Sequence, residues 1–300
     1  MERTPDFITI GAMKCATTTL HEQLARQPGV VMSRPKEPNF FSDDDVYARG
    51  MGWYTGLFAA AGPEDLCGES STHYTKLPTY PKSVERMVAA LPSVKLIYVM
   101  RHPIDRLFSQ FVHERTVGRV SPELSVGEAI EACPELVAYG RYAEQLAPYL
   151  ETYGRERVLP VFFGRLARFP QEEFSRIGAF LGRPDQFVWD ASMEPQNVGD
   201  KRLRLGRVRH ALVHSRVLSP IRQRLVSRSW SERLKRAWRT DVERPELTSD
   251  LESRLRQIYD EDLARLGAWL GVSLDCESFD RVTGSEPREW RTTRSGTDPR

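Results

Sequence analysis

The stretch DFITIGAMKCATTTLHEQL, residues 6–24, decides the fold class of this chain. It begins with an apolar run at 7–10 that predicts a buried strand, turns at Gly11, and continues into a pattern that predicts a helix over 18–26. A strand, a tight turn and a helix in this order bring the first N–H groups of the helix and the positive end of its dipole to one spot. The stretch therefore predicts an anion-binding loop in an α/β protein.

Similar strand and helix patterns alternate through the following 160 or so residues. The expected strands are 7–10, 30–32, 66–68, 95–100 and 158–163, and the expected helices are 18–26, 83–91, 104–116, 141–153 and 172–181. This alternation predicts a three-layer α/β fold with a central, mostly parallel sheet flanked by helices. Ligands bind at the carboxyl ends of strands in such sheets, so we expect the chemistry there.

The 300 residues are expected to form a single domain over 1–275, followed by a flexible tail over 276–300. The domain includes a clean helical pattern at 249–270, with Ser249 as its candidate N-cap. The tail is polar and rich in Thr, Arg, Ser and Pro, and within it only Trp290 is a candidate for docking.

The composition is that of a soluble globular protein, with 40% apolar residues, 28% charged residues and a formal net charge of +2. No run of 18 apolar residues predicts a membrane span, and the first residues do not have the pattern of a signal peptide. The four cysteines are widely spaced, which indicates reduced thiols and a cytoplasmic location. No nucleic-acid partner is expected.

The near-zero net charge conceals a strongly basic segment at 201–239, which holds eleven arginines and two lysines against one glutamate. Its apolar residues favour a packed helix with a basic outer face. An acceptor-recruiting surface and a peripheral membrane contact are the alternatives. The histidines at 210 and 214 have no third ligand beside them, so no metal site is expected.

The quoted loop carries hydroxyls at Thr17, Thr18 and Thr19 and one ammonium at Lys14, which suit a phosphate or a sulfonate. Thr18 or Thr19 taken alone is explained equally well as a helix cap. A nucleotide triphosphatase loop would place its lysine next to the threonine that binds magnesium, whereas Lys14 precedes Thr17 by three residues. The loop therefore indicates an anion held without magnesium.

Three further stretches carry polar residues at expected strand ends: RPKEPNFFS at 34–42, CGESSTHY at 67–74 and KLIYVMRHPIDRLFSQFVHER at 95–115. Arg101 at a strand end and Ser109 two helical turns later can bind one phosphate from two sides. Glu37 beside an anion pocket is a candidate base for a hydroxyl proton.

With these four stretches in order, the chain resembles the sulfotransferases that use 3′-phosphoadenosine 5′-phosphosulfate (PAPS), in the branch of the heparan sulfate sulfotransferases and their bacterial relatives. The likeness extends over roughly the first 200 residues and implies a P-loop-like fold. It also implies metal-free transfer of a sulfuryl group to a hydroxyl or amine of a carbohydrate, glycoconjugate, lipid or natural product.

The resemblance also implies roles for individual residues. The 5′-phosphosulfate would bind at Lys14, Ala16, Thr17, Thr18 and Thr19, and the 3′-phosphate at Arg101 and Ser109, with Lys201 and Arg202 reaching the donor from a later loop. Glu37 would be the base, and Lys14 would stabilise the departing phosphate oxygen. Ala16 and Ser70 depart from the family pattern, in which Gly and Lys are common.

The sequence leaves several alternatives open. His73 and His113 are rival bases, because histidine titrates near neutral pH. A magnesium-dependent small-molecule kinase and an inactive phosphonucleotide-binding module are the alternative functions. The acceptor and the oligomeric state are not specified by any motif.

Overall fold

Five parallel strands form a single sheet in the computed structural model, which describes residues 3–193 and 247–291. The strands are β1 (Phe7–Gly11), β2 (Val30–Met32), β3 (Leu66–Ser70), β4 (Lys95–Met100) and β5 (Val158–Phe162). Their order across the sheet is β2-β3-β1-β4-β5, and Phe7 of β1 is in register with Gly68 of β3 on one side and Lys95 of β4 on the other. Every residue of β1 and β5 is buried, as expected for a parallel sheet covered on both faces.

Helices connect the strands and cover the sheet. In the described ranges they are α1 (Thr17–Leu24), α2 (Asp44–Tyr47), α3 (Gly50–Gly56), α4 (Ser83–Ala90), α5 (Pro103–Val117), α6 (Val126–Ala132), α7 (Glu135–Ala138), α8 (Tyr142–Tyr153), α9 (Phe163–Arg168), α10 (Pro170–Phe180), α14 (Ser249–Leu270) and α15 (Phe279–Ser285), with 3₁₀ turns η1 (Thr72–Thr75) and η2 (Arg155–Arg157).

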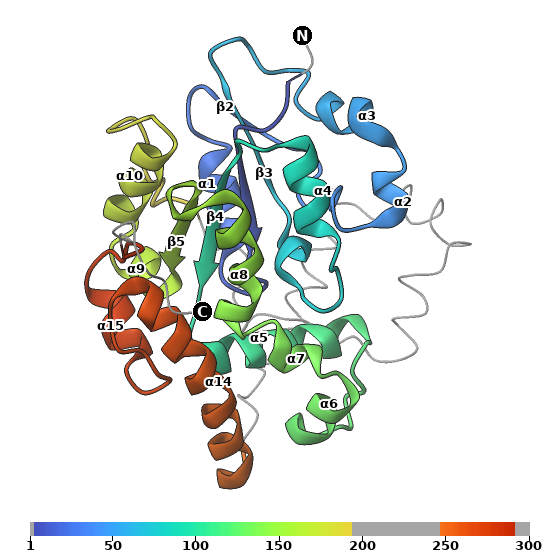
Figure 1. Ribbon diagram of the computed structural model, residues 1–300, viewed down its shortest axis with the longest axis vertical. Helices are drawn as coiled ribbons and strands as arrows, with labels where there is room; N and C mark the ends of the chain where they lie inside the picture. The colour runs from blue at the N-terminus through green and yellow to red at the C-terminus, as the bar shows by residue number, and fades with distance from the viewer. Residues whose placement is uncertain (1–2, 194–246, 292–300) are drawn as a thin grey trace.

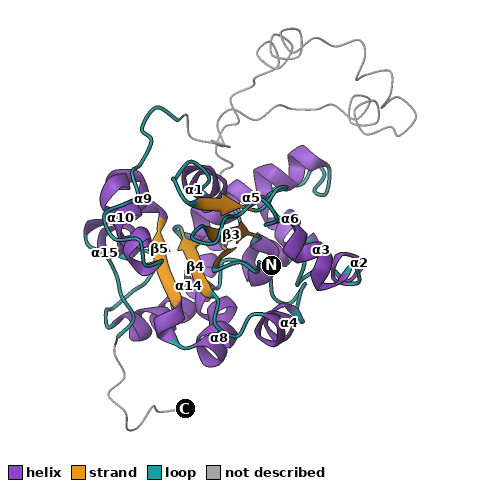
Figure 2. Cartoon of the chain, turned by 90° about the horizontal axis from the view of Figure 1, so that it is seen from above, coloured by secondary structure: helices purple, strands orange, loops and turns teal. Residues whose placement is uncertain are grey.

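The helices form a layer on each side of the sheet. In Figure 1, α4 and α8 lie in front of the strands and α1 lies behind them, and Figure 2 shows the same separation from above. This arrangement follows from the right-handed crossover rule, because β1 leads to β2 in one direction and β3 leads to β4 in the other. The strands point toward α5, so their carboxyl ends face that helix (Figure 1).

Local sequence signals explain where several helices begin and end. Pro103 opens α5, where its missing N–H costs nothing, and Gly118 closes that helix at a φ of 80°. Ser125 and Glu128 form a capping box at the start of α6. Thr248, rather than the predicted Ser249, caps α14 by accepting a hydrogen bond from the amide of Leu251.

The prediction of a mostly parallel three-layer fold is confirmed, and each expected strand lies within two residues of its observed bounds. The expectation of a flexible tail from 276 is wrong for 276–291. Phe279 of α15 is buried, and the indole of Trp290 donates a hydrogen bond to the carbonyl of Val158 at 2.5 Å. The buried ring of Phe279 and the hydrogen-bonded, half-buried indole of Trp290 outweigh the polar composition of this stretch. The basic segment 201–239 lies outside the described residues.

Within the part of the chain that the structure describes, no helix is both long and apolar enough to cross a membrane. All four cysteines are free thiols, and three of them are buried.

Candidate functional site

The loop after β1 is folded so that backbone N–H groups gather at the carboxyl end of that strand. The amide of Ala12 donates to the carbonyl of Val99 at 2.8 Å, which ties the loop to β4. The first helical bond of α1 runs from Leu20 to Ala16 at 3.1 Å, so the amides of Thr17 and Thr18 precede it and point out of the helix N-terminus. Exposed amides at a helix N-terminus have the geometry that suits an anion, and anion binding at this loop stays a prediction.

Two residues of this loop adopt the left-handed conformation that usually requires glycine. Lys14 has a φ of 69° and Ala16 a φ of 64°. For a residue with a Cβ this conformation costs about 1 kcal/mol, and strain of this kind is common at functional sites. Ala16 is also the N-cap of α1, which has no side-chain cap, so Thr18 and Thr19 lie inside the first turn instead of capping it. Lys14 and the threonine hydroxyls are thus placed around one loop.

Arg101 and Ser109 lie at the end of β4 and on α5, as predicted. The guanidinium of Arg101 stacks on the ring of Phe163, 5.1 Å from its centroid, and lies 3.8 Å from Asp105. Ser109 is half-buried two turns along the same helix. Because β1 and β4 are neighbours in the sheet, their carboxyl ends place a second cationic group beside the loop of Lys14.

Glu37 is held at the same edge of the sheet by a loop anchored in an aromatic cluster. Its amide donates to the carbonyl of Ser70 at 3.0 Å, at the end of β3. Three residues later Phe40 stacks on Tyr54 with ring centroids 4.5 Å apart, and Phe41 packs edge-on against the same ring. These buried rings fix the loop, and Glu37 is brought to the carboxyl end of β3.

The carboxylate of Glu37 is ionised at neutral pH. Burial alone would raise the pKa of Glu37, but the charge of Lys36 and its hydrogen bond at 2.6 Å, with a further contribution from Lys76, bring that pKa below its ordinary value. The hydroxyl of Thr72 also lies 3.4 Å from the same oxygen, Oε1. Glu37 is therefore available to accept a proton.

His73 lies near Glu37 and is neutral. Its ring stacks on Tyr80 with centroids 4.5 Å apart, and burial lowers the pKa of His73 to about 4, with Lys76 acting in the same direction. Its Nδ1 is buried and has no hydrogen-bond partner among the described residues. His113, the other rival base, is half-buried on α5.

Two buried residues near Glu37 were not found from the sequence. Lys76, directly after η1, is only 7% exposed, and burial lowers its pKa to about 8. Its ammonium lies over the ring of Tyr139 at 5.7 Å. His21 of α1 is buried and lies 3.0 Å from the hydroxyl of Ser70, and burial lowers the pKa of His21 to about 4. No spacing pattern marks either residue, because each becomes part of the site only through the packing of η1 and α1 on the sheet.

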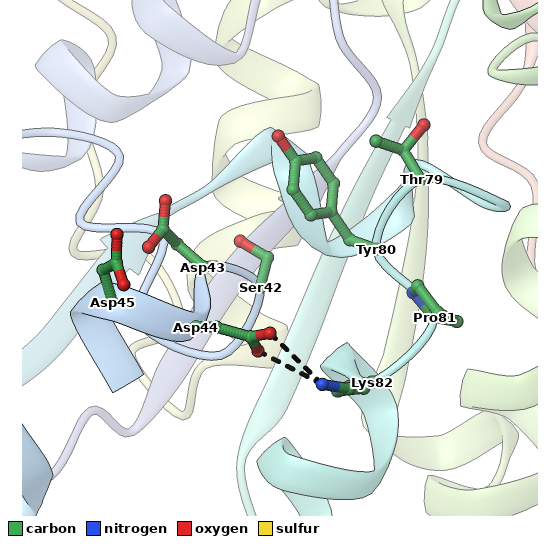
Figure 3. A pocket seen from close by; sticks show the side chains of 8 residues that line it. All are labelled: Ser42, Asp43, Asp44, Asp45, Thr79, Tyr80, Pro81 and Lys82. Atoms are coloured by element: carbon green, nitrogen blue, oxygen red, sulfur yellow. Dashed lines mark hydrogen bonds and ion pairs between the residues drawn. The ribbon is translucent and has the colours of Figure 1, made fainter. Parts of the chain in front are cut away.

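A pocket of about 430 Å³ adjoins His73. Two segments line it, and Figure 3 shows them facing each other, with Asp44 bound to Lys82 across the opening. The lining residues are Ser42, Asp43, Asp44, Asp45, Thr79, Tyr80, Pro81 and Lys82. Tyr80 therefore separates this pocket from the ring of His73.

In the described ranges, no three His, Cys, Asp or Glu side chains are grouped so that they could hold a metal ion. The histidines at 210 and 214 lie outside the described residues, as do the predicted donor contacts Lys201 and Arg202.

Comparison with known proteins points to one family. A family model described as a sulfotransferase domain matches residues 4–267. The human bifunctional heparan sulfate N-deacetylase/N-sulfotransferase 2 is 28% identical over 199 residues, which are 60% of this chain and 22% of that protein. The mouse heparan sulfate glucosamine 3-O-sulfotransferase 6 is 29% identical over 189 residues, 60% of this chain and 53% of that protein. The chain thus spans only about a fifth to a half of the length of these curated relatives.

Two solved structures extend the comparison. A sulfotransferase from Alicyclobacillus acidocaldarius superposes with a TM-score of 0.64 at 26% identity, covering 91% of this chain and 98% of that one. The mouse sulfotransferase SULT7A1, crystallised with PAP (adenosine 3′,5′-bisphosphate), has a TM-score of 0.50 at 16% identity, covering 87% of this chain and 84% of that one. This shows a likeness of fold alone.

Proposed function

Because the chain belongs to the sulfotransferase domain family, we propose that it transfers a sulfuryl group from PAPS to a hydroxyl or amine of an acceptor. The observation that carries this proposal is the arrangement at one edge of the sheet. The loop of Lys14 after β1 and Arg101 after β4 provide two separate anion sites, and Glu37 provides a carboxylate at the end of the neighbouring β3. A donor with a 5′-phosphosulfate and a 3′-phosphate matches two anion sites.

In the proposed reaction the acceptor oxygen or nitrogen forms a bond to sulfur while the bond from sulfur to the bridging phosphate oxygen breaks. The acceptor proton passes to Glu37, and the phosphate oxygen keeps the electron pair of the broken bond, where Lys14 stabilises its charge. Positioning and charge stabilisation supply most of the rate, since the leaving group is a good one. We write the step without a metal because Arg101 stands after β4, where a kinase would carry a metal-binding acid.

Glu37 is preferred to His73 as the base because of its position. Its amide donates to the carbonyl of Ser70 at the end of β3, and two residues later the amide of Asn39 donates to the hydroxyl of Ser71. The carboxylate of Glu37 is ionised at neutral pH and can accept a proton. One face of the His73 ring is covered by Tyr80, on which it stacks. We expect Glu37→Gln to reduce kcat by about a hundredfold or more. Nearly full activity of the Glu37→Gln enzyme across the pH range would contradict this assignment and favour His73 as the base.

The acceptor is proposed only by class, as a carbohydrate, glycoconjugate, lipid or natural product. The printed names of the two curated relatives include both an N-sulfotransferase and a 3-O-sulfotransferase, so both amines and hydroxyls remain in the proposal. A cytoplasmic location is proposed from the free cysteines.

A thermal-shift comparison tests the donor. Adenosine 3′,5′-bisphosphate (PAP), the product of the donor, should raise the melting temperature, and ATP with magnesium should not. Transfer of labelled sulfate from PAPS to a library of acceptors then tests turnover. Stabilisation by ATP with magnesium alone would favour the kinase, and binding of PAP without any transfer would favour an inactive binding module.

A further inference from the structure

The hydroxyl of Tyr142 connects the two anion-binding elements of the site. Tyr142 is the first residue of α8 and is completely buried, with its ring packed edge-on against Tyr98 of β4. Its hydroxyl donates to the carbonyl of Arg101 at 2.6 Å and accepts from the amide of Arg101 at 3.2 Å. The same hydroxyl lies 3.8 Å from the sulfur of Cys15, in the loop between Lys14 and Ala16.

Two hydrogen bonds to the N–H and C=O of one residue fix the orientation of its backbone. Arg101 stands where β4 ends and α5 has not yet begun, so the regular bonds of neither element hold it. The guanidinium is restrained separately by the ring of Phe163. Tyr142 therefore sets the backbone from which the guanidinium of Arg101 extends, and a buried tyrosine is well suited to this because burial keeps its pKa far above neutral and its hydroxyl protonated.

The position of Tyr142 is itself fixed from a distant part of the chain. Asp262 of α14 accepts hydrogen bonds from the amides of Ala143 and Glu144, at 2.9 and 3.0 Å, and so caps the first turn of α8. Asp262 is only 1% exposed. A carboxylate on α14 thus holds the helix whose first residue holds Arg101.

We propose that Tyr142 is a positioning residue for the 3′-phosphate of the donor, acting through the backbone of Arg101. The inference rests on the proposed function, in which Arg101 binds that phosphate. Tyr142 makes the enzyme distinguish a nucleotide with a 3′-phosphate from one without it. The contact to Cys15 is a weaker one, because sulfur is a poor hydrogen-bonding partner.

The test compares the binding of PAP and adenosine 5′-monophosphate, which lacks the 3′-phosphate, by calorimetry. Tyr142→Phe keeps the ring and removes the hydroxyl. We expect it to weaken the binding of PAP by about tenfold and that of the monophosphate by less than about twofold, the usual effect of an unpaired buried amide. In an Arg101→Ala background the same change should have little further effect, because Tyr142 acts on the 3′-phosphate only through Arg101, and that interaction is already lost.

Tyr153→Phe is the matched control, since Tyr153 lies on the same helix and its buried hydroxyl has no partner among the described residues. It should bind both nucleotides like the wild type. Cys15→Ala removes the sulfur contact and should leave the preference for PAP intact. If Tyr142→Phe does not fold, Asp262→Asn provides a second test, and it should lower the preference for PAP in the same direction.

The outcomes separate the two proposals. If Arg101→Ala keeps the preference for PAP, the assignment of Arg101 to the 3′-phosphate is wrong and the role of Tyr142 falls with it, whereas the donor itself is tested by the thermal shift with PAP and by sulfate transfer. If Arg101→Ala abolishes the preference while Tyr142→Phe keeps it, or if Tyr142→Phe weakens both nucleotides equally, only the inference about Tyr142 is overturned.

Discussion

The ammonium of Lys36 lies 2.6 Å from Oε1 of Glu37, so the proposed base is ion-paired to the residue that precedes it in the chain. The positive charge of Lys36 is the main influence that lowers the pKa of Glu37 against the effect of burial. Activity that needs an ionised Glu37 should therefore persist to a lower pH than it would without this neighbour.

Lys36→Met should raise the pKa of Glu37 and move the acidic limb of the kcat/KM profile to higher pH. The profile of labelled sulfate transfer between pH 4 and 9 measures this shift. Lys82→Met is a suitable control, because Lys82 forms an exposed pair with Asp44. An acidic limb that stays in place in Lys36→Met would show that the limb reports another group.

Lys14→Ala should lower kcat by about a hundredfold or more and weaken PAP binding far less, because charge builds up on the departing phosphate oxygen mainly in the transition state. Steady-state kinetics with PAPS and calorimetry with PAP measure the two effects. A loss of PAP affinity as large as the loss of kcat would make Lys14 a binding residue rather than a catalytic one.

Ala16→Gly should stabilise the protein by about 1 kcal/mol, because glycine adopts a φ of 64° without the strain that alanine has there. Thermal or urea unfolding measures the change. Ala89 is exposed on α4, and Ala89→Gly should have the opposite effect, destabilising the protein by roughly 0.5–1 kcal/mol. Equal destabilisation by both changes would contradict the assignment of strain to Ala16.

The buried carboxyl of Glu69 should make folding stability depend on pH near neutrality. Its Oε2 accepts a hydrogen bond from Tyr54 at 2.5 Å, and burial raises the pKa of Glu69 from 4.5 to about 7. Because the folded state holds this proton more tightly than the unfolded chain, the stabilisation is complete below about pH 4.5 and is lost as the pH rises through about 7.

Glu69→Gln should remove this dependence. Between pH 5 and 8 the free energy of unfolding should fall more in the wild type than in Glu69→Gln, by a difference on the order of 3 kcal/mol. Urea unfolding at a series of pH values measures that difference, and Glu151→Gln, an exposed change on α8, should follow the wild type. Parallel curves for wild type and Glu69→Gln would mean that Glu69 titrates as an ordinary carboxyl.

The sheet and the strand–turn–helix geometry of the loop after β1 could be predicted from the sequence, because both depend on local signals. The apolar run before Gly11 and the helical pattern after it predict a strand, a turn and a helix. The apolar run before Arg101 likewise predicts β4. The helices that were missed, such as α2 and α7, have four residues each, too few for a helical period to be visible. Thr248 was passed over as the cap of α14 because the neighbouring serine fits the same pattern equally well.

The surroundings of Glu37 could not be predicted in the same way. Lys76 and His21 reach the site from η1 and α1, and their burial and altered pKa values arise only when these elements pack. Tyr142 is equally invisible, because its contact with Arg101 joins residues 41 positions apart. Long-range packing of this kind has no signature in spacing or composition.

The C-terminal stretch that packs on β5 has a consequence for solubility. β5 is the last strand at one edge of the sheet, and an open edge invites pairing with a strand of another molecule. Trp290 donates a hydrogen bond to the carbonyl of Val158, and Arg176 donates one to the carbonyl of Pro160 at 2.9 Å. Pro160 itself has no N–H with which to pair an added strand. These side chains leave an incoming strand little to bind. A chain shortened to residue 275 would expose part of this edge, and aggregation would be its characteristic failure.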